Sequence, residues 1–253
     1  MTTPAVTLPA LGPPVDELWH VLLDLGERLA VPWTLVGGQM VLLHALEHGH
    51  VPPQISQDGD VIADIRAASG ALSDVVAALG DDGFALEGIG PDGVGHRYVR
   101  PTAGATGPRR KITVDVLAPE GVGTRADLTT TPPGHTVQVP GGTQALDRTE
   151  LVTVIHEGRS GTVPRPTLLG ALVTKAAACG LPDDAARHLR DLTLLCALVD
   201  DPFAMRAQLT AKDRQRLGLA VALSDRGHQA WLLVPDAIRP NGQIAYAVLI
   251  EAL

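Results

Sequence analysis

The stretch from residue 34 to residue 65 constrains the fold of this chain most. A short β-prone segment ends there in two glycines, Gly37 and Gly38, and a helix-like run follows them. A second β-prone segment then opens with two aspartates one residue apart, Asp58 and Asp60. Because residues i and i+2 of a strand project to the same face, we expect the two carboxylates to lie side by side.

Two neighbouring carboxylates repel each other unless a cation lies between them. Mg²⁺ typically takes one or two carboxylates together with the phosphate oxygens of a substrate. The paired glycines carry no Cβ, so their backbone can approach a phosphate closely. The segment therefore predicts a magnesium site beside a phosphate-binding backbone.

A third carboxylate, Asp115, stands in the middle of an otherwise apolar segment at 111–117 that reads as a strand. An unpaired charge in such a strand is costly. The charge is explained if this strand runs beside the strand of Asp58 and Asp60, so that all three carboxylates share a metal site. The alternative is an aspartate at the end of a strand, facing solvent.

A cluster of basic residues precedes Asp115, with no acidic residue among them: Arg97, Arg100, Arg109, Arg110 and Lys111. Such a cluster can hold a triphosphate or an RNA backbone. Arg97 is the strongest phosphate candidate because it falls in a β-prone stretch. The alternative for Arg109 and Arg110 is a solvated hairpin tip.

The chain reads as helical from Thr167 onward, and this half supplies two further charged positions. Lys175 flanks an apolar helix face, which suits a side chain that reaches over the rim into a cleft. Asp191 follows Arg187 by four residues and precedes a run of leucines. Alternatively, Arg187 and Asp191 form a surface ion pair, worth roughly a few tenths of a kcal/mol.

The chain resembles the nucleotidyltransferase superfamily, and within it the AbiEii/AbiGii-like toxin family, because four motifs occur in the order that is usual for that family. They are the glycine pair, the Asp-x-Asp motif, the helical lysine and an Arg-Asp pair followed by leucines. The resemblance spans residues 35–195. It implies an α/β fold, a mixed sheet with flanking helices, followed by a mainly helical C-terminal part. It also implies a transferase that moves a nucleoside monophosphate from an NTP to an acceptor hydroxyl.

The same resemblance implies roles for the matched residues. The residues expected to take part in catalysis are Asp58, Asp60, Asp115, Lys175 and Asp191. Those expected to bind the nucleotide are Gly37, Gly38, Gln39, Arg97 and Lys175. The three aspartates of the first set would hold two Mg²⁺ ions, and the carboxylate at 191 would support catalysis or orient the lysine. The implied partners are an NTP, RNA or tRNA as the acceptor, and an antitoxin protein.

We expect two parts: an α/β core over residues 1–165, whose Pro-rich residues 1–14 are poorly ordered, and a helical domain over residues 166–253. Hydrophobic periodicity predicts helices at 15–29, 39–47, 69–80, 168–179, 183–199, 203–209 and 212–224. It predicts strands at 33–36, 58–62, 84–86, 96–100, 111–117, 136–139 and 151–155, and a hairpin turn at 158–161.

Composition narrows the class of protein. A chain of 253 residues with 45% apolar residues can bury a sizeable core. The net charge of -8 argues against a generally basic nucleic-acid-binding surface, and 3% aromatic residues argue against base-stacking platforms. Two cysteines without metal-binding spacing suit a reducing compartment. With no signal-peptide pattern and no membrane-spanning run, we expect a cytoplasmic protein.

Three alternatives remain open. One is a nucleotidyltransferase that modifies a small molecule, as antibiotic-modifying enzymes do. A second is a degenerate, non-catalytic interaction module, supported by Gln39 after the glycine pair and by Gly59 between the aspartates. A third is a zinc site at the His-x-x-Glu-His pattern of His44 and His48, for which no third ligand is evident.

Overall fold

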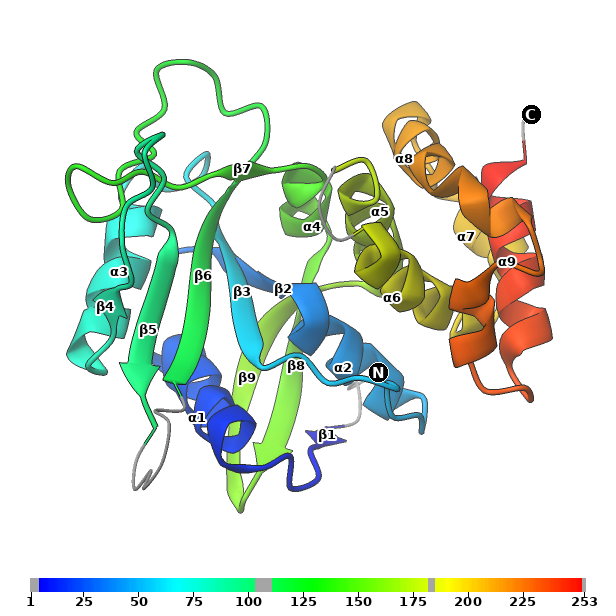
Figure 1. Cartoon of the computed structure of the whole chain (residues 1–253), viewed down its shortest axis with the longest axis horizontal. Helices are drawn as coiled ribbons and strands as arrows, with labels where there is room; N and C mark the ends of the chain where they lie inside the picture. The colour runs from blue at the N-terminus through cyan, green and yellow to red at the C-terminus, as the bar shows by residue number, and fades with distance from the viewer. Residues whose placement is uncertain (1–4, 103–110, 182–184, 252–253) are drawn as a thin grey trace.

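A computed structural model describes residues 5–102, 111–181 and 185–251. Two small sheets and their helices form one side of the molecule, and the C-terminal helices form the other (Figure 1). Two of the predicted basic residues, Arg109 and Arg110, lie outside the described residues.

The main sheet is mixed. Its strand order is β2-β3-β6-β5-β4, and β7 pairs with β6 off this path. The strands are β2 (Trp33–Val36), β3 (Asp58–Ala63), β4 (Ala85–Leu86), β5 (Arg97–Pro101), β6 (Lys111–Pro119) and β7 (Gln138–Val139). The two central strands, β3 and β6, run parallel, while β2 and β5 are antiparallel to their neighbours. This pairing places the strand of the third aspartate beside the strand of the first two, as the sequence predicts.

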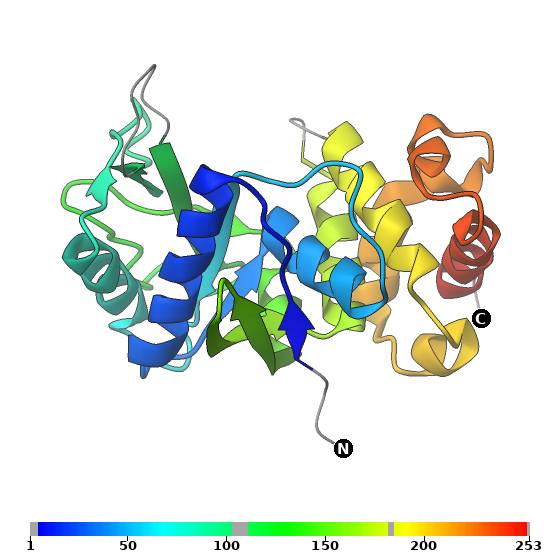
Figure 2. The ribbon, with the colours of Figure 1, turned by 90° about the horizontal axis from the view of Figure 1, so that it is seen from below.

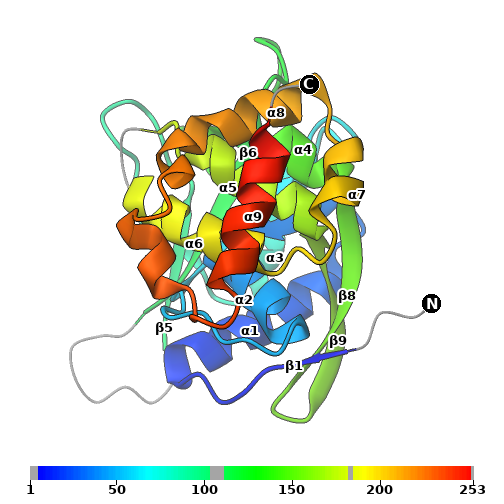
Figure 3. The same cartoon turned by 90° about the vertical axis from the view of Figure 1, so that its right-hand side faces the viewer.

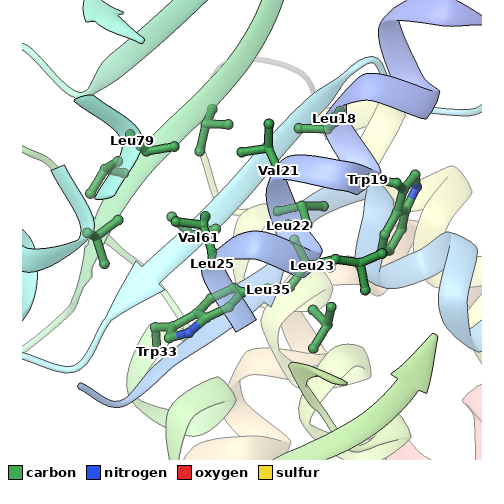
Figure 4. Close-up of a cluster of buried hydrophobic side chains, with 14 of the residues drawn as sticks. Leu18, Trp19, Val21, Leu22, Leu23, Leu25, Trp33, Leu35, Val61 and Leu79 are labelled. Atoms are coloured by element: carbon green, nitrogen blue, oxygen red, sulfur yellow. The ribbon is translucent and has the colours of Figure 1, made fainter. Parts of the chain in front are cut away.

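One face of this sheet packs against α1 (Pro13–Arg28) and α3 (Ala71–Asp81), which lie next to each other (Figure 2). Leu18, Leu22 and Leu25 of α1 are fully buried, and they meet Leu35 and Val61 of the sheet (Figure 4). Burying one such side chain contributes about 1.5–3 kcal/mol. Because side chains alternate along a strand, the aspartates at the intervening positions project from the opposite face.

The second sheet contains β1 (Val6–Thr7), β8 (Thr149–His156) and β9 (Arg159–Pro166) in the order β1-β8-β9. Two sequence expectations change here. The strand predicted at 151–155 is half of a longer hairpin, and its turn consists of residues 157 and 158 alone. Part of the segment expected to be poorly ordered pairs with β8 as β1, because Val6 and Leu8 bury their side chains in the core.

The C-terminal helices lie close together (Figure 3), and their buried side chains form a second hydrophobic core. They are α5 (Leu168–Ala178), α6 (Ala185–Ala197), α7 (Pro202–Ala207), α8 (Ala211–Leu217) and α9 (Arg239–Ile250), with the 3₁₀ helices η1 (Gly218–Ser224) and η2 (Gln229–Leu233). Hydrophobic periodicity did not predict α9 or the short α4 (Gly142–Asp147). None of the helices in the described ranges has both the length and the apolar character needed to cross a membrane.

Helix α2 (Gly37–Glu47) belongs to both parts of the molecule. Its Leu42 and Leu43 lie in the core of the α/β part, whereas Met40, Val41 and Ala45 lie in the core of the helical part. The mixed α/β part ends with β9, and the helices of the C-terminal part begin with α5. The glycine-pair helix nevertheless ties the two cores together.

A glycine on α1 provides a test of the packing between α1 and the second sheet. A Cβ at Gly26 would lie 2.1 Å from the backbone oxygen of Thr162 in β9. We therefore expect Gly26→Ala to destabilise the protein by about 1–3 kcal/mol, although alanine favours helices. The matched control is Gly80→Ala in α3, where nothing lies within 4 Å and a gain of up to about 1 kcal/mol is expected. Urea unfolding measures both, and a stabilised Gly26→Ala variant would contradict the close packing.

Candidate active site

The approach of Gly37 to Asp60 defines the centre of the site. Val36 pairs with Asp60 across β2 and β3, and Gly37 then opens α2 with a φ of 69°. A Cβ on Gly37 would lie 1.7 Å from Oδ2 of Asp60. Both the left-handed backbone and the missing space therefore require glycine at this position. The Asp60 carboxylate lies against the first residue of a helix, the end at which the helix dipole favours negative charge.

The surroundings of Asp60 disfavour the charged form of its carboxylate. Its Oδ2 atom is buried and has no hydrogen-bond partner among the residues that the structure describes. Burial raises the pKa of Asp60 from 3.8 to about 6, and the charges of Asp115 and Asp58 raise this pKa as well. Lys175 and Arg187 oppose the shift. A carboxylate in this state gains from a cation that replaces its lost hydration.

Asp115 is adjacent to Asp60 in register but has a partner of its own. Asp60 pairs with Asp115 across β3 and β6, and Arg97 pairs with Asp115 across β5 and β6. Arg97 donates two hydrogen bonds to the carboxylate, from Nε at 2.9 Å and from Nη2 at 2.8 Å. The buried charge of Asp115 is thus compensated by Arg97, where the sequence predicts either a shared metal site or a carboxylate that faces solvent.

Two residues that the sequence assigns to different ligands therefore form an ion pair with each other. Arg97, expected to bind phosphate, holds Asp115, expected to bind metal. No choice of one oxygen from each of Asp58, Asp60 and Asp115 brings all three within 4.8 Å of one another. The structure places the three aspartates on one face of the sheet but not around a common point.

Lys175 and Asp191 lie together, across α5 and α6. Lys175 is almost fully buried, and its Nζ donates to Oδ2 of Asp191 at 2.6 Å. The charge of Lys175 also lowers the pKa of Asp60, so the lysine acts on the site from the helical part. The resemblance predicts that Asp191 either supports catalysis or orients the lysine, and this contact joins the two side chains directly.

Two cavities adjoin the aspartates. The larger has a volume of about 530 Å³, and its lining includes Gly38, Asp58, Arg190 and Asp191. The smaller, of about 140 Å³, is lined by residues that include Gly37, Asp60 and Lys175. Arg187 lines both. Each cavity is therefore bounded by the first turn of α2, by the start of β3 and by α6.

Gln39 has a different position from the one expected. It is fully buried, and its Nε2 donates to the backbone oxygen of Ser56 at 2.7 Å. The Oγ atom of Ser56 in turn accepts from the backbone N–H of Asp58. A Cβ on Gly38 would lie 2.4 Å from Cβ of Ser56. Gln39 thus fixes the segment before β3, and neither cavity has it in its lining.

Gly59, between the two aspartates, has a packing explanation. A Cβ at this position would lie 3.1 Å from Cδ1 of Leu18 and 3.6 Å from Cδ2 of Leu22, on the far side of β3 from the carboxylates. Glycine at 59 therefore lets α1 approach the sheet. Its presence does not bear on whether the aspartates bind a cation.

The histidine pair of α2 is engaged elsewhere. Nε2 of His44 donates to the backbone oxygen of Pro166 at 3.0 Å, and Nδ1 of His48 donates to the backbone oxygen of His44 at 2.8 Å. Burial lowers the pKa of His44 well below its ordinary value, so this ring is neutral. These contacts do not favour the zinc alternative.

The carboxylates of Asp58 and Asp60 are suitable ligands for a hard divalent cation. The two carboxylates share one face of β3, and the unpartnered buried oxygen of Asp60 is the kind of atom that an ion satisfies. Asp115 does not join them while Arg97 holds it. A site with two protein carboxylates leaves the remaining coordination positions to water and substrate oxygens.

Sequence reasoning left two cavity residues out of the site, Arg187 and Arg190. Both line the larger cavity, and neither guanidinium group has an ion-pair partner within the described residues. Arg187 precedes Asp191 by one helical turn, which is the signal that could have placed it beside the lysine contact. Unpaired guanidinium groups at a cavity suit phosphate oxygens.

The raised pKa of Asp60 makes stability depend on pH in a defined direction. Between about pH 4 and pH 6 the folded state binds more protons than the unfolded state, so stability falls as pH rises through this window. In EDTA at about pH 7.5, we expect Asp60→Asn to be more stable than the wild type by roughly 3 kcal/mol. At about pH 4 the difference should vanish.

Urea unfolding across this pH range measures the effect, and Mg²⁺ supplies the control. Added Mg²⁺ should stabilise the wild type and leave Asp60→Asn unchanged, since binding to the folded state raises its stability. If Asp60→Asn is less stable than the wild type at every pH, the carboxylate is not strained as described.

Comparisons with known proteins bear on the fold. No protein-family model matches the chain, and no curated protein matches it. Among solved structures, the chain is similar to the crystal structure of an antigenic nucleotidyltransferase-like protein from Paracoccidioides brasiliensis. The two are 14% identical and align over 94% of each chain with a TM-score of 0.53. This likeness confirms the nucleotidyltransferase-type α/β fold with a mainly helical C-terminal part.

Proposed function

We propose that this protein is a nucleotidyltransferase that moves a nucleoside monophosphate from an NTP to an acceptor hydroxyl. One observation carries the proposal. The buried Oδ2 of Asp60, which has no hydrogen-bond partner among the described residues, lies against the first residue of α2 and on the same strand face as Asp58. Two cavities adjoin it, and Arg187, which has no ion-pair partner in the described part of the chain, lines both. Such a site suits a polyphosphate together with a divalent ion.

Different groups around the two cavities can bind different parts of a triphosphate. Backbone N–H groups in the first turn of α2 have no side-chain cap, so they are available to phosphate oxygens at Gly37 and Gly38. Arg187 and Arg190 supply charge from α6 at the larger cavity. Lys175, held by Asp191, supplies charge at the smaller one. Each of these groups stabilises negative charge that develops on the transferring phosphate.

Mg²⁺, when bound, would neutralise phosphate charge and lower the pKa of the attacking hydroxyl. Asp58 and Asp60 are the residues that would hold it. The second ion implied by the resemblance needs Asp115, which Arg97 engages in this structure. We retain Asp115 as a predicted ligand for the nucleotide-bound state, in which Arg97 would turn to a phosphate.

We further propose a toxin-like role with RNA, tRNA included, as the acceptor and an antitoxin protein as a partner. Support for this finer assignment comes from the order of four motifs over residues 35–195, which resembles the AbiEii/AbiGii-like family. The guanidinium groups of Arg187 and Arg190 line the larger cavity together with the carboxylates of Asp58 and Asp191. Guanidinium groups of this kind can bind the phosphate oxygens of an RNA backbone.

Label transfer tests the activity and the acceptor together. The protein is incubated with each α-labelled NTP, Mg²⁺ and either total tRNA or a panel of small alcohols, including aminoglycosides. We expect label on RNA, and a loss of at least about 100-fold in Asp58→Ala because an ion ligand is removed. The control is Asp74→Asn, an exposed aspartate on α3 that should transfer label like the wild type.

The outcomes separate the alternatives. Label on a small alcohol and none on RNA would support the small-molecule enzyme. Transfer that survives Asp58→Ala would rule out the mechanism. An absence of transfer, with no NTP or Mg²⁺ binding by calorimetry, would leave the non-catalytic interaction module.

Two variants separate the role of the Lys175 charge in activity from the role of its contact with Asp191 in stability. Lys175→Met removes the charge, and we expect KM for the NTP to rise about tenfold or more and kcat to fall. The variant also leaves Asp191 without its partner, so stability should drop. In Lys175→Met/Asp191→Asn, urea unfolding should show recovered stability while activity stays low. Recovery of both quantities in the double variant would show that Lys175 serves packing only.

A further inference from the structure

Three potential metal ligands gather where α1 meets the tip of the β8–β9 hairpin. His20 lies on α1, His156 ends β8, and Glu157 begins the turn into β9. One ring nitrogen of each histidine and one carboxylate oxygen of Glu157 all lie within 4.8 Å of one another. Nε2 of His20 is 3.0 Å from Oε2 of Glu157, and the centroids of the two imidazole rings are 5.3 Å apart.

The buried histidine of this group lacks hydrogen bonds. The side chain of His156 is 1% exposed, and within the described ranges neither of its ring nitrogens has a hydrogen-bond partner. Its Nε2 lies 3.3 Å from Oδ1 of Asp16, without the geometry of a hydrogen bond. The two oxygens of Asp16 already accept from the backbone N–H groups of Leu11 and Gly12. An unsatisfied buried imidazole costs about 1–3 kcal/mol, which a ligand on the ring would offset.

The hairpin turn presents the carboxylate toward the histidines. Glu157 has a φ of 47°, and Gly158, which follows it, has a φ of 81°. A two-residue turn of this kind favours Asn or Gly at its first position, so glutamate is held there at some cost. The result is a carboxylate within hydrogen-bond distance of His20, next to the buried ring of His156.

We propose that His20, His156 and Glu157 bind a single transition-metal ion, with Zn²⁺ the best match. Two imidazoles and one carboxylate are a common three-ligand set for zinc, with a fourth position left to water. Ligand atoms in a tetrahedral site are about 3.4 Å apart, so small side-chain rotations would complete it. Asp16, beside His156, is placed to orient the ring, as carboxylates next to metal-bound histidines do.

The site is accessible and separate from the aspartates of β3. His20 and Glu157 are 34% and 53% exposed, so an ion can reach them from solvent. None of the three ligands lines either cavity of the candidate active site. Metal bound here would join α1 to the β8–β9 hairpin, two elements that pack together in the fold. Its primary effect is therefore on stability, whatever the outcome of the label-transfer experiment.

Metal titration of the full-length, EDTA-treated protein tests the site. We expect one equivalent of Zn²⁺ by calorimetry, a rise in Tm with Zn²⁺, and a visible Co²⁺ absorption spectrum typical of four-coordinate geometry. His20→Gln and Glu157→Gln change exposed side chains, so the fold should persist, while Zn²⁺ affinity should fall at least about tenfold in each. His50→Gln, a histidine outside the group, is the matched control and should bind like the wild type.

Two results would overturn the site. One is the absence of stoichiometric Zn²⁺ and Co²⁺ binding by the wild type. The other is an affinity in His20→Gln and Glu157→Gln that equals that of His50→Gln, which would place the metal elsewhere. Loss of Zn²⁺ stabilisation in His20→Gln and Glu157→Gln, with unchanged urea unfolding in EDTA, would support it.

Discussion

The site depends on the contact between Gly37 and Asp60. The helix that carries the glycine pair begins where a side chain would overlap the carboxylate, so a buried negative charge lies against a helix N-terminus with an oxygen left unsatisfied. The charges of Asp115 and Asp58 raise the pKa of Asp60 further, because they disfavour a third negative charge. Lys175 and Arg187, which belong to the helical part, lower this pKa. Because α2 contributes to both cores, it connects the acidic strand with the cationic helices.

Much of the fold and of the site could be predicted because the signals are local. Helical spacing of apolar residues locates α1, and the Asp-x-Asp motif locates the strand that carries Asp58 and Asp60. The apolar run around Asp115 predicts a strand, and the cost of an unpaired charge there predicts that this strand lies beside that of Asp58 and Asp60, as observed. The contact of Lys175 with Asp191 is one of the two possibilities that the family resemblance implies. Single segments therefore predict the helices and strands, whereas these two contacts needed a further physical or family argument.

The remaining features depend on pairing between distant segments. β9 contains Gly161, Pro164 and Pro166, which read as a loop, and it becomes a strand because β8 and α1 pack on it. Arg97 meets Asp115 through strand register, which the sequence does not specify at this separation. The close approach of Gly59 to Leu18 likewise turns an apparent departure from the motif into a packing requirement.

A crystal structure of the protein with Mn²⁺ and a non-hydrolysable NTP analogue tests the site most directly, because Mn²⁺ gives an anomalous signal and replaces Mg²⁺. We expect an anomalous peak between the carboxylates of Asp58 and Asp60, within about 2.2 Å of an oxygen from each. We also expect the triphosphate to lie along the first turn of α2, in contact with Lys175 or Arg187. A nucleotide bound elsewhere, or Mn²⁺ without a contact to either aspartate, would contradict the proposed function.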